Sequence, residues 1–352
     1  ICVVIIAVVL DKLSLAWANK QKDYFANLSF FQRNKLSIFF IFLTIICSIV
    51  AFISSYYFPK GFNYLYLIPF NKGLTVSPML DAFVDWIWNT FFYYLNTFNI
   101  FLLTNVLGPM KQAYLNMPVI SSFVLFMGAG YIIGGFRSCI IVGSLILFIA
   151  LSEYWDRALI TMYMATFAVG ISAISGIIVG SLCAQNEFAS KSILSLCDFF
   201  QTFPSFIYLI PVILLFGITD TSVMIAAIVY ASVPATRYTV EGLRSVPPSL
   251  HDAGSMSGVS NFQRWKSIEL PLAFPHIMLG INQTLIFALM MIVLGALIGT
   301  EDLGQIIMGC LSRPNGAGIG LTLGIFVSFI CLAADNLIRT WADERKKLLG
   351  IE

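Results

Sequence analysis

Long apolar stretches recur along the chain and constrain its fold more than any other feature. A helix of about twenty apolar residues crosses a hydrocarbon core roughly 30 Å thick. Because backbone polar groups must be paired within the protein in lipid, such segments must be helical. With 59% hydrophobic and 11% charged residues among 352, this is not a soluble globular composition. We predict an all-α, polytopic membrane protein with crossings at about 1–18, 36–58, 118–135, 138–152, 157–184, 199–217, 222–237, 272–299 and 319–338.

The basic residues give these crossings an orientation. The polar stretch 250–271 interrupts the apolar pattern, and we place it in the cytoplasm with the crossings alternating outward from it. Fifteen of the twenty lysines and arginines then lie inside, a bias that the opposite orientation would invert. Since cytoplasmic loops carry the excess of basic residues, this orientation is the expected one and makes the C-terminus cytoplasmic. The five outer basic residues are Lys60, Lys72, Lys111, Arg157 and Arg313.

The apolar pattern divides the chain into three parts. Residues 1–22 are expected to form a membrane helix with a charged tail, 23–117 a helix plus an outer-side segment, and 118–345 the membrane core. Residues 59–117 lie between two outward-facing ends, so they cross the membrane twice or not at all. The stretch 79–105 mixes acids and amides with many aromatics, which favours a helix lying in the outer interface.

The polar stretch, with the few residues before it (247–271), has the sequence pattern of two short helices joined at a sharp turn. Ser249 followed by Asp252 is typical of a capping box, and so is Ser260 followed by Gln263. Gly258 can adopt the left-handed conformation that ends a helix. The pattern therefore predicts a rigid knob with defined ends.

The landmarks of this segment have a distinctive spacing: an acidic-Ala-Gly triplet, three residues, a Gly, nine residues and Ile-x-Leu-Pro. The spacing resembles the cytoplasmic coupling loop in membrane subunits of binding-protein-dependent ABC importers. That resemblance implies a type I importer permease fold with extra N-terminal helices, and a separate ATPase that docks on the loop. Aspartate stands where the family usually has glutamate, and the third triplet residue is Gly where Ala is common. The implied coupling residues are Asp252, Ala253, Gly254, Gly258, Ile268, Leu270 and Pro271.

The energy source must be another polypeptide, because no GxxxxGK[ST] phosphate-binding loop occurs in these 352 residues. We therefore expect a transport subunit and not an enzyme, with ATP on the partner chain and no cofactor on this one. The seven scattered cysteines and two distant histidines predict no metal site. The net charge of +2 gives no indication of a nucleic-acid partner.

Two flanking stretches resemble glycine betaine and proline permeases of this family. They are QTFPSFIYLIP at 201–211 and GINQT at 280–284. The resemblance implies a small compatible solute such as glycine betaine, choline or proline. Polar amides and broken helices at membrane depth can line a passage, although hydrogen bonding between packed helices is an equally simple interpretation. The path candidates are Gln201, Thr202, Pro204, Tyr208, Asn282 and Gln283.

An acidic pair, Glu301 and Asp302, stands where relatives commonly have small residues. At the outer mouth it could contact a binding protein or attract a cationic solute, or it could belong to an ordinary solvated loop.

The resemblance also implies an assembly in a bacterial cytoplasmic (inner) membrane. Its parts are an ABC ATPase, an external solute-binding protein, a second permease copy (a homodimer or a fused half) and membrane lipid. The end segments 5–22 and 329–346 align without gaps, with Trp17 on Trp341. Either these are unrelated helices that leave the membrane in a similar way, or 1–22 is the tail of a preceding permease copy.

Two alternative functions remain. The first is the same machinery with another solute, such as a sulfonate or another amine. The second is a secondary transporter driven by an ion gradient, which would place ionisable residues at mid-membrane depth. No convincing acid or base falls in the centre of the predicted core crossings, so an ATP-driven importer is favoured.

Overall fold

The computed structural model describes residues 9, 13–14, 35–57 and 77–349. All regular structure in these residues is helical, which confirms the all-α prediction. The expected crossing at 1–18 falls outside the described residues, apart from three isolated positions.

The chain divides into two compact units, which are described separately. In Val9–Thr90, α3 (Lys35–Tyr57) coincides with the expected crossing at 36–58. Helix α4 (Ser77–Phe101) begins in this unit and ends in the other. It is not among the described helices that are long and apolar enough to span a membrane. An interfacial position for 79–105 stays a prediction.

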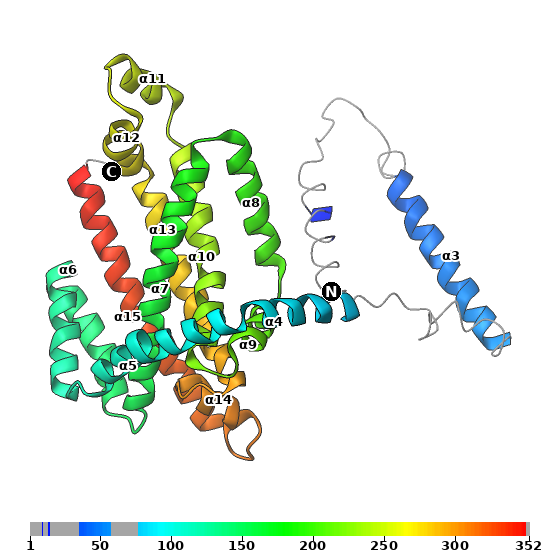
Figure 1. Ribbon diagram of the computed structural model, residues 1–352, viewed down its shortest axis with the longest axis horizontal. Helices are drawn as coiled ribbons and strands as arrows, with labels where there is room; N and C mark the ends of the chain where they lie inside the picture. The colour runs from blue at the N-terminus through cyan, green and yellow to red at the C-terminus, as the bar shows by residue number, and fades with distance from the viewer. Residues whose placement is uncertain (1–8, 10–12, 15–34, 58–76, 350–352) are drawn as a thin grey trace. The chain divides into compact units, whose positions relative to one another are not determined.

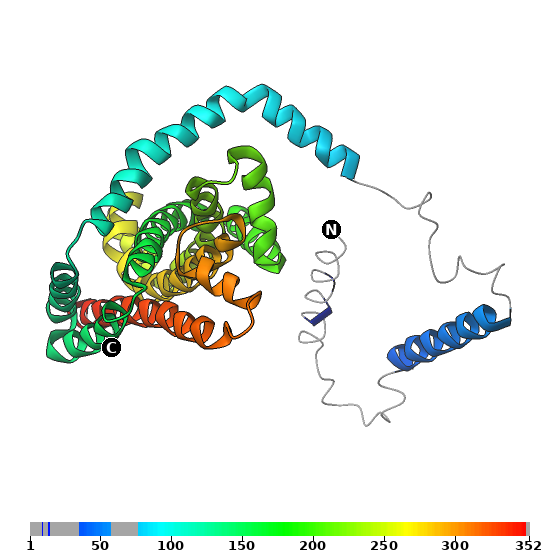
Figure 2. The ribbon, with the colours of Figure 1, turned by 90° about the horizontal axis from the view of Figure 1, so that it is seen from below.

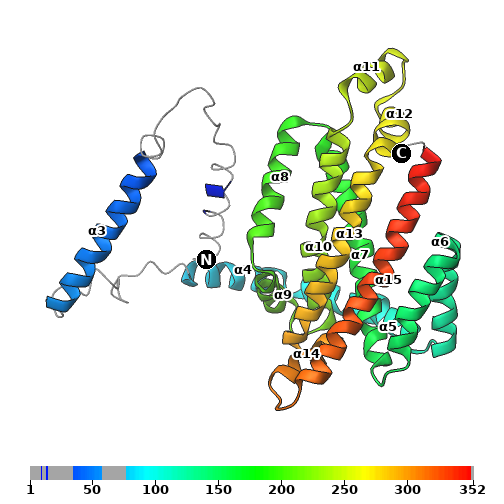
Figure 3. The ribbon, with the colours of Figure 1, turned by 180° about the vertical axis from the view of Figure 1, so that it is seen from behind.

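The unit from Phe91 onward is a helical bundle (Figures 1 and 3). Among the described residues, five helices are long and apolar enough to cross a membrane. One of them, Asn261–Ile298, is made of four consecutive elements. They are α12 (Asn261–Arg264), the π-helical turn η5 (Trp265–Glu269), α13 (Leu270–Gly295) and η6 (Ala296–Ile298). The other four spans are α6 (Val119–Ala150), α7 (Trp155–Ala184), α10 (Asp220–Arg244) and α15 (Ala317–Leu349).

Helix α6 is a hairpin of two arms. The chain reverses at Gly135, whose φ of 64° is in the left-handed region that glycine adopts freely. A β-carbon on Gly130 would lie 3.0 Å from Cα of Cys139, and one on Gly143 would lie 2.9 Å from Cγ of Met127. The arms therefore run side by side in opposite directions, and the expected boundary between 118–135 and 138–152 is confirmed.

The expected crossing at 199–217 is not one continuous helix. Helix α8 (Glu187–Thr202) ends there, and a 3₁₀ turn, η4 (Ser205–Tyr208), leads into α9 (Leu209–Phe216) after a bend of 105°. Pro204 disfavours helical geometry at the residue before it, and Phe203 is extended with ψ 132°. The proline thus divides one apolar run into two helices.

Small residues allow α7 and α10 to pack closely. Ser172 Oγ donates a hydrogen bond to the carbonyl oxygen of Ile228 at 3.0 Å. A β-carbon on Gly180 would lie 2.7 Å from Cβ of Thr239. Four-residue spacing of small side chains is the usual means of close helix contact in lipid.

Shorter helices close the ends of the bundle. Helices α11 (Pro248–Met256) and α12 lie at the same end of the bundle as the C-terminal end of α15 (Figures 1 and 3). Viewed along the bundle, the stretch from residue 91 through α5 curves round its edge (Figure 2). The helices at the end opposite α11 are η3 (Leu102–Leu107), α5 (Gly108–Leu115) and α14 (Leu303–Leu311).

Candidate functional site

The predicted coupling loop, 247–271, forms a helix–turn–helix knob. Gly258 has φ 75° at the turn, as expected. Ser260 Oγ accepts a hydrogen bond from Gln263 N at 3.3 Å, and Gln263 Oε1 accepts one from Ser260 N at 2.8 Å, which confirms this capping box. The first box is not formed as expected, because α11 begins at Pro248 and so places Ser249 inside its first turn.

The second helix of the coupling loop is continuous with a membrane span. Helix α12 passes through the π turn η5 directly into α13, where Pro271 occupies the first turn. The prediction of two separate short helices is therefore corrected. Pro271 lies within this continuous helix and removes one backbone hydrogen bond from it, and the π turn η5 just before it is the kind of local adjustment that accommodates a proline. A force on the loop would be passed along one rigid element into the membrane.

Gly254 is the residue on which the two halves of the coupling loop meet. A β-carbon there would lie 3.1 Å from Cδ1 of Ile268 and 3.5 Å from Cγ of Arg264. Asp252 and Ala253 are exposed, whereas Leu270 and Pro271 are half-buried. The structure thus brings Gly254 and Ile268 together and leaves the acidic end of the triplet facing outward.

An ion pair braces the second half of the loop. Arg264 Nε lies 2.8 Å from Glu269 Oε1, and Glu269 is 8% exposed. A buried carboxylate needs such a partner, because leaving it uncompensated is strongly destabilising.

The tip of the coupling loop is apolar although it projects from the bundle. Met256 is 90% exposed and Phe262 66%, with Val259 also exposed. Phe262 stacks on Trp265, with ring centroids 5.8 Å apart. Contiguous exposed apolar side chains mark contact surfaces, so the tip has the character of a docking surface.

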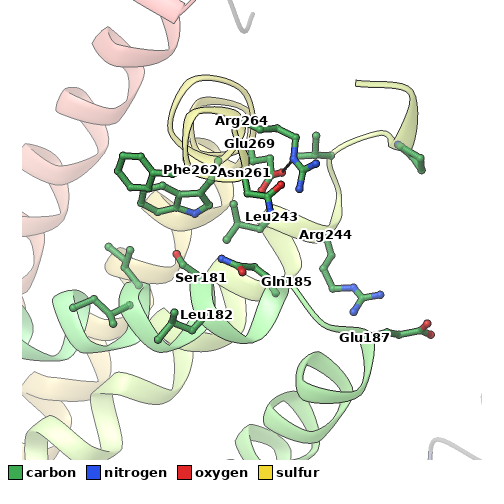
Figure 4. Close-up of a pocket in the computed structure, with 16 residues that line it drawn as sticks. Ser181, Leu182, Gln185, Glu187, Leu243, Arg244, Asn261, Phe262, Arg264 and Glu269 are labelled. Atoms are coloured by element: carbon green, nitrogen blue, oxygen red, sulfur yellow. Dashed lines mark hydrogen bonds and ion pairs between the residues drawn. The ribbon is translucent and has the colours of Figure 1, made fainter. Parts of the chain in front are cut away.

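A cavity of about 940 Å³ lies between the coupling loop and the adjoining ends of α7, α8 and α10 (Figure 4). Leu182, Leu243 and Trp265 contribute apolar walls, and Gln185 a polar one. Among the described residues, neither Ser181 Oγ nor Trp265 Nε1 has a hydrogen-bond partner. Because the cavity separates the coupling loop from α7, α8 and α10, the loop is joined to the bundle chiefly through the helix that continues into α13.

Four path candidates surround the bend between α8 and α9. Gln201 is exposed, and its Oε1 accepts a hydrogen bond from Arg237 Nη1 at 3.1 Å. Thr202 Oγ1 donates a hydrogen bond to the carbonyl oxygen of Phe199 in the same helix. Pro204 lies at the bend itself. Tyr208 is buried, and its hydroxyl donates to the carbonyl oxygen of Phe200 at 2.5 Å. Tyr208 therefore braces the bend, whereas Gln201 is accessible.

The other two path candidates lie on α13. Asn282 is buried, and its Oδ1 has no partner within the described part of the chain; Gln283 is half-buried. Stacked rings of Tyr230 and Phe287, 4.9 Å apart, cover the face one turn beyond Gln283. No described contact joins this pair of amides to Gln201.

A charged cluster on α8 and α10 was missed in the sequence. Arg237 Nη1 lies 2.8 Å from Asp198 Oδ1, and Arg237 Nε lies 3.0 Å from Glu241 Oε1. The expected crossings began at 199 and ended at 237, so they left Asp198 and Glu241 outside and placed Arg237 at a boundary. The four-residue spacing of Arg237 and Glu241 was the one available signal. The cluster lies toward the ends of α8 and α10, so the expectation that the centres of the core crossings lack ionisable residues stays a prediction.

At the opposite end of the bundle, the acidic pair is split. Asp302 is 0% exposed and caps α14, where its Oδ1 accepts hydrogen bonds from Gln305 N at 3.3 Å and Thr300 Oγ1 at 3.1 Å. It cannot touch a binding protein from this position, so that expectation is corrected. Glu301 is exposed and lies 3.2 Å from Lys111 Nζ.

Around Glu301 a polar network joins four segments. Lys111 on α5 also lies 3.5 Å from Asp220 Oδ2, which accepts a hydrogen bond from the Tyr163 hydroxyl at 3.1 Å. Arg157 donates to the carbonyl oxygen of Glu301 at 2.7 Å. None of these long-range pairs was readable from sequence spacing.

The buried cap gives a testable pH dependence. Burial raises the pKa of Asp302 from 3.8 to about 6. The folded protein therefore binds this proton more tightly than the unfolded chain, and stability falls as pH rises from about 4 to about 6. Asp302→Asn keeps an equally good cap without the charge. We expect its Tm in detergent at pH 7 to exceed that of the wild type, with the difference vanishing at pH 4.

Thermal unfolding of both proteins at pH 4, 5, 6 and 7 checks this. Parallel curves with a constant offset would contradict a buried ionising Asp302.

The part of the chain that contains the coupling loop is similar to known transport proteins. Residues 176–346 match the family model described as "Binding-protein-dependent transport system inner membrane component". A trimethylamine N-oxide transport system permease protein of Pelagibacter ubique is 59% identical over 351 residues, which cover 100% of this chain and 49% of that protein. Its counterpart in Ruegeria pomeroyi is 34% identical, covering 100% and 52%.

A glycine betaine transport system permease protein of Bacillus subtilis is 29% identical over 275 residues, covering 78% of this chain and 96% of that protein. The chain spans about half the length of the two trimethylamine N-oxide relatives.

Proposed function

We propose that the chain is the permease subunit of an ATP-driven importer of small methylated zwitterions, and the match of residues 176–346 to the inner-membrane components of binding-protein-dependent transport systems supports this. The observation that carries the proposal is the coupling loop: a rigid, apolar-tipped knob whose second helix continues into the span Asn261–Ile298. Such an element can receive a push outside the membrane and move a helix inside it.

In the proposed mechanism a separate ATPase docks on the coupling loop from the cytoplasm. Closure of the ATPase shifts the loop and with it α13, and packed helices then rock between two arrangements that open the path to alternate sides. The C-terminal end of α15 lies at the loop end of the bundle (Figure 3) and is cytoplasmic in this scheme. An external binding protein delivers solute at the opposite end, near Glu301. A second permease copy or fused half completes the path.

The names of the relatives support the proposed solute class. Their names specify trimethylamine N-oxide and glycine betaine. Both solutes carry a positive charge on a methylated nitrogen and a negative charge on oxygen. Choline lacks the negative oxygen, and a sulfonate such as taurine lacks the methylated nitrogen.

Uptake in proteoliposomes tests the proposal. The full-length protein is reconstituted with its ATPase and binding protein, and labelled trimethylamine N-oxide, glycine betaine, choline, proline and taurine are offered with and without ATP. We expect ATP-dependent uptake of the first two. Uptake that follows an ion gradient without ATP, or ATP-driven uptake of taurine or proline alone, would overturn the proposal.

A further inference from the structure

The charged cluster of Asp198, Arg237 and Glu241 lies inside the length of its helices. Arg237 stands seven residues before the end of α10 at Arg244, roughly 10 Å along the axis at 1.5 Å per residue. Asp198 stands eleven residues after the start of α8 at Glu187, roughly 16 Å by the same rise. Glu187 and Arg244 both border the cavity at the coupling-loop end, so the two depths are measured from the same side.

These charges are accessible at that depth. The side chains of Asp198, Arg237 and Glu241 are 42%, 35% and 38% exposed. Charged groups within a membrane-spanning region avoid lipid and face a water-filled cavity or another protein surface. The face of α8 and α10 that carries the cluster therefore borders an aqueous space or a partner, not the hydrocarbon core.

The ion pairs of the cluster are too weak to be explained by a need to hold α8 against α10. Half-exposed ion pairs contribute only about 0–1 kcal/mol each. The packing of α10 on α7 already fixes α10, and α8 is tied to its neighbours by buried Cys197 and Ser190. Ion pairs that contribute so little can exchange one partner for a passing solute at small cost.

The chemistry of the cluster is that of a zwitterion site. It holds one guanidinium and two carboxylates, with the Gln201 amide 3.1 Å from the guanidinium. A guanidinium donates paired hydrogen bonds to an anionic oxygen, and a carboxylate attracts a methylated cation. The rings of Phe199 and Phe203, 4.7 Å apart, lie at the same end of α8 as Asp198 and are of the kind that methylated ammonium groups prefer.

We propose that Asp198, Arg237 and Glu241 form a contact site for the zwitterionic solute on the cytoplasmic half of its path. Arg237 binds the anionic oxygen, and Asp198 and Glu241 attract the methylated nitrogen. The inference rests on the proposed function and adds to it a site of selectivity within the permease itself.

The test compares solutes across isosteric variants in reconstituted full-length protein. Arg237→Gln removes the group that binds the anionic oxygen, so uptake of glycine betaine should fall about tenfold while the ratio of choline to glycine betaine uptake rises. Asp198→Asn should reduce the uptake of both glycine betaine and trimethylamine N-oxide, because both carry the methylated nitrogen. Asp343→Asn removes an exposed ion pair near the end of α15 and is the matched control, expected to leave uptake unchanged.

Tm in detergent and ATPase activity without solute are measured for each variant. Unchanged solute ratios in Arg237→Gln would overturn the inference. So would an equal loss for every solute that parallels a fall in Tm, because that is the behaviour of a brace. A wild-type protein that imports no methylated zwitterion would instead overturn the proposed function, so the two failures are distinguishable.

Discussion

Gly258→Val should strongly reduce ATP-driven uptake while the protein still inserts and folds in the membrane. Gly258 has φ 75°, where a β-branched residue is a strong outlier that costs on the order of 1–3 kcal/mol. No other atom lies within 4 Å of a β-carbon built there, so the change creates no clash. The turn must instead relax and tilt α11 against α12. Since each 1.4 kcal/mol corresponds to about tenfold in rate, a cost of this size lowers uptake about 5- to 150-fold.

Gly258→Asn is the matched control for this prediction. Asparagine adds a side chain of similar size but adopts the left-handed conformation more readily than other non-glycine residues, so most uptake should remain. Uptake in proteoliposomes and co-purification of the ATPase are measured for both variants. Equal uptake by the valine variant and the wild type would show that the turn geometry is not required for coupling.

The parts of the coupling loop that were predicted from sequence depend on local interactions. Gly258 ends a helix because of its own backbone freedom, and Ser260 and Gln263 cap the next helix across three residues. Such signals need no knowledge of the rest of the chain. The boundary within α6 was equally readable, because the Gly134–Gly135 pair marks the reversal directly.

The parts that were missed depend on the tertiary fold. Apolar windows end at the first charged residue, whereas α8 begins at Glu187 and α10 continues to Arg244. The helices therefore extend past the apolar windows and bring Asp198 beside Arg237 and Glu241. The bend of 105° at Pro204 has a local cause, but its direction is set by packing around Tyr208.

The burial of Asp302 also depends on the tertiary fold and could not be predicted from the sequence. An acid in a loop beside Glu301 suggests solvent, and only the position of α14 against α7 buries it, where Leu303 N donates to Thr161 Oγ1 at 3.1 Å. The position of Asp302 three residues before Gln305 can predict the helix cap, but it cannot predict that the cap is buried.

Arg264→Met should both destabilise the protein and stop coupled uptake. The substitution keeps an apolar stem against Gly254 but removes the guanidinium 2.8 Å from Glu269 Oε1. Removing one partner of a buried ion pair is destabilising, and the Glu269 carboxylate loses the hydrogen bond from Arg264. We expect a clear fall in Tm and more than tenfold lower uptake. Arg339→Met breaks the exposed pair with Asp335 and should change little.

The double variant Arg264→Met/Glu269→Met separates bracing from docking. Replacing both partners of a buried pair with apolar side chains is often neutral or stabilising, so Tm should return to about the wild-type value. Because Glu269 is buried and the docking tip is built from Met256, Val259 and Phe262, we expect uptake to return with it. The pair would then act by holding the second helix of the coupling loop in line with α13. Uptake that stays lost while Tm recovers would contradict this and assign the Arg264 charge to the surface that meets the ATPase.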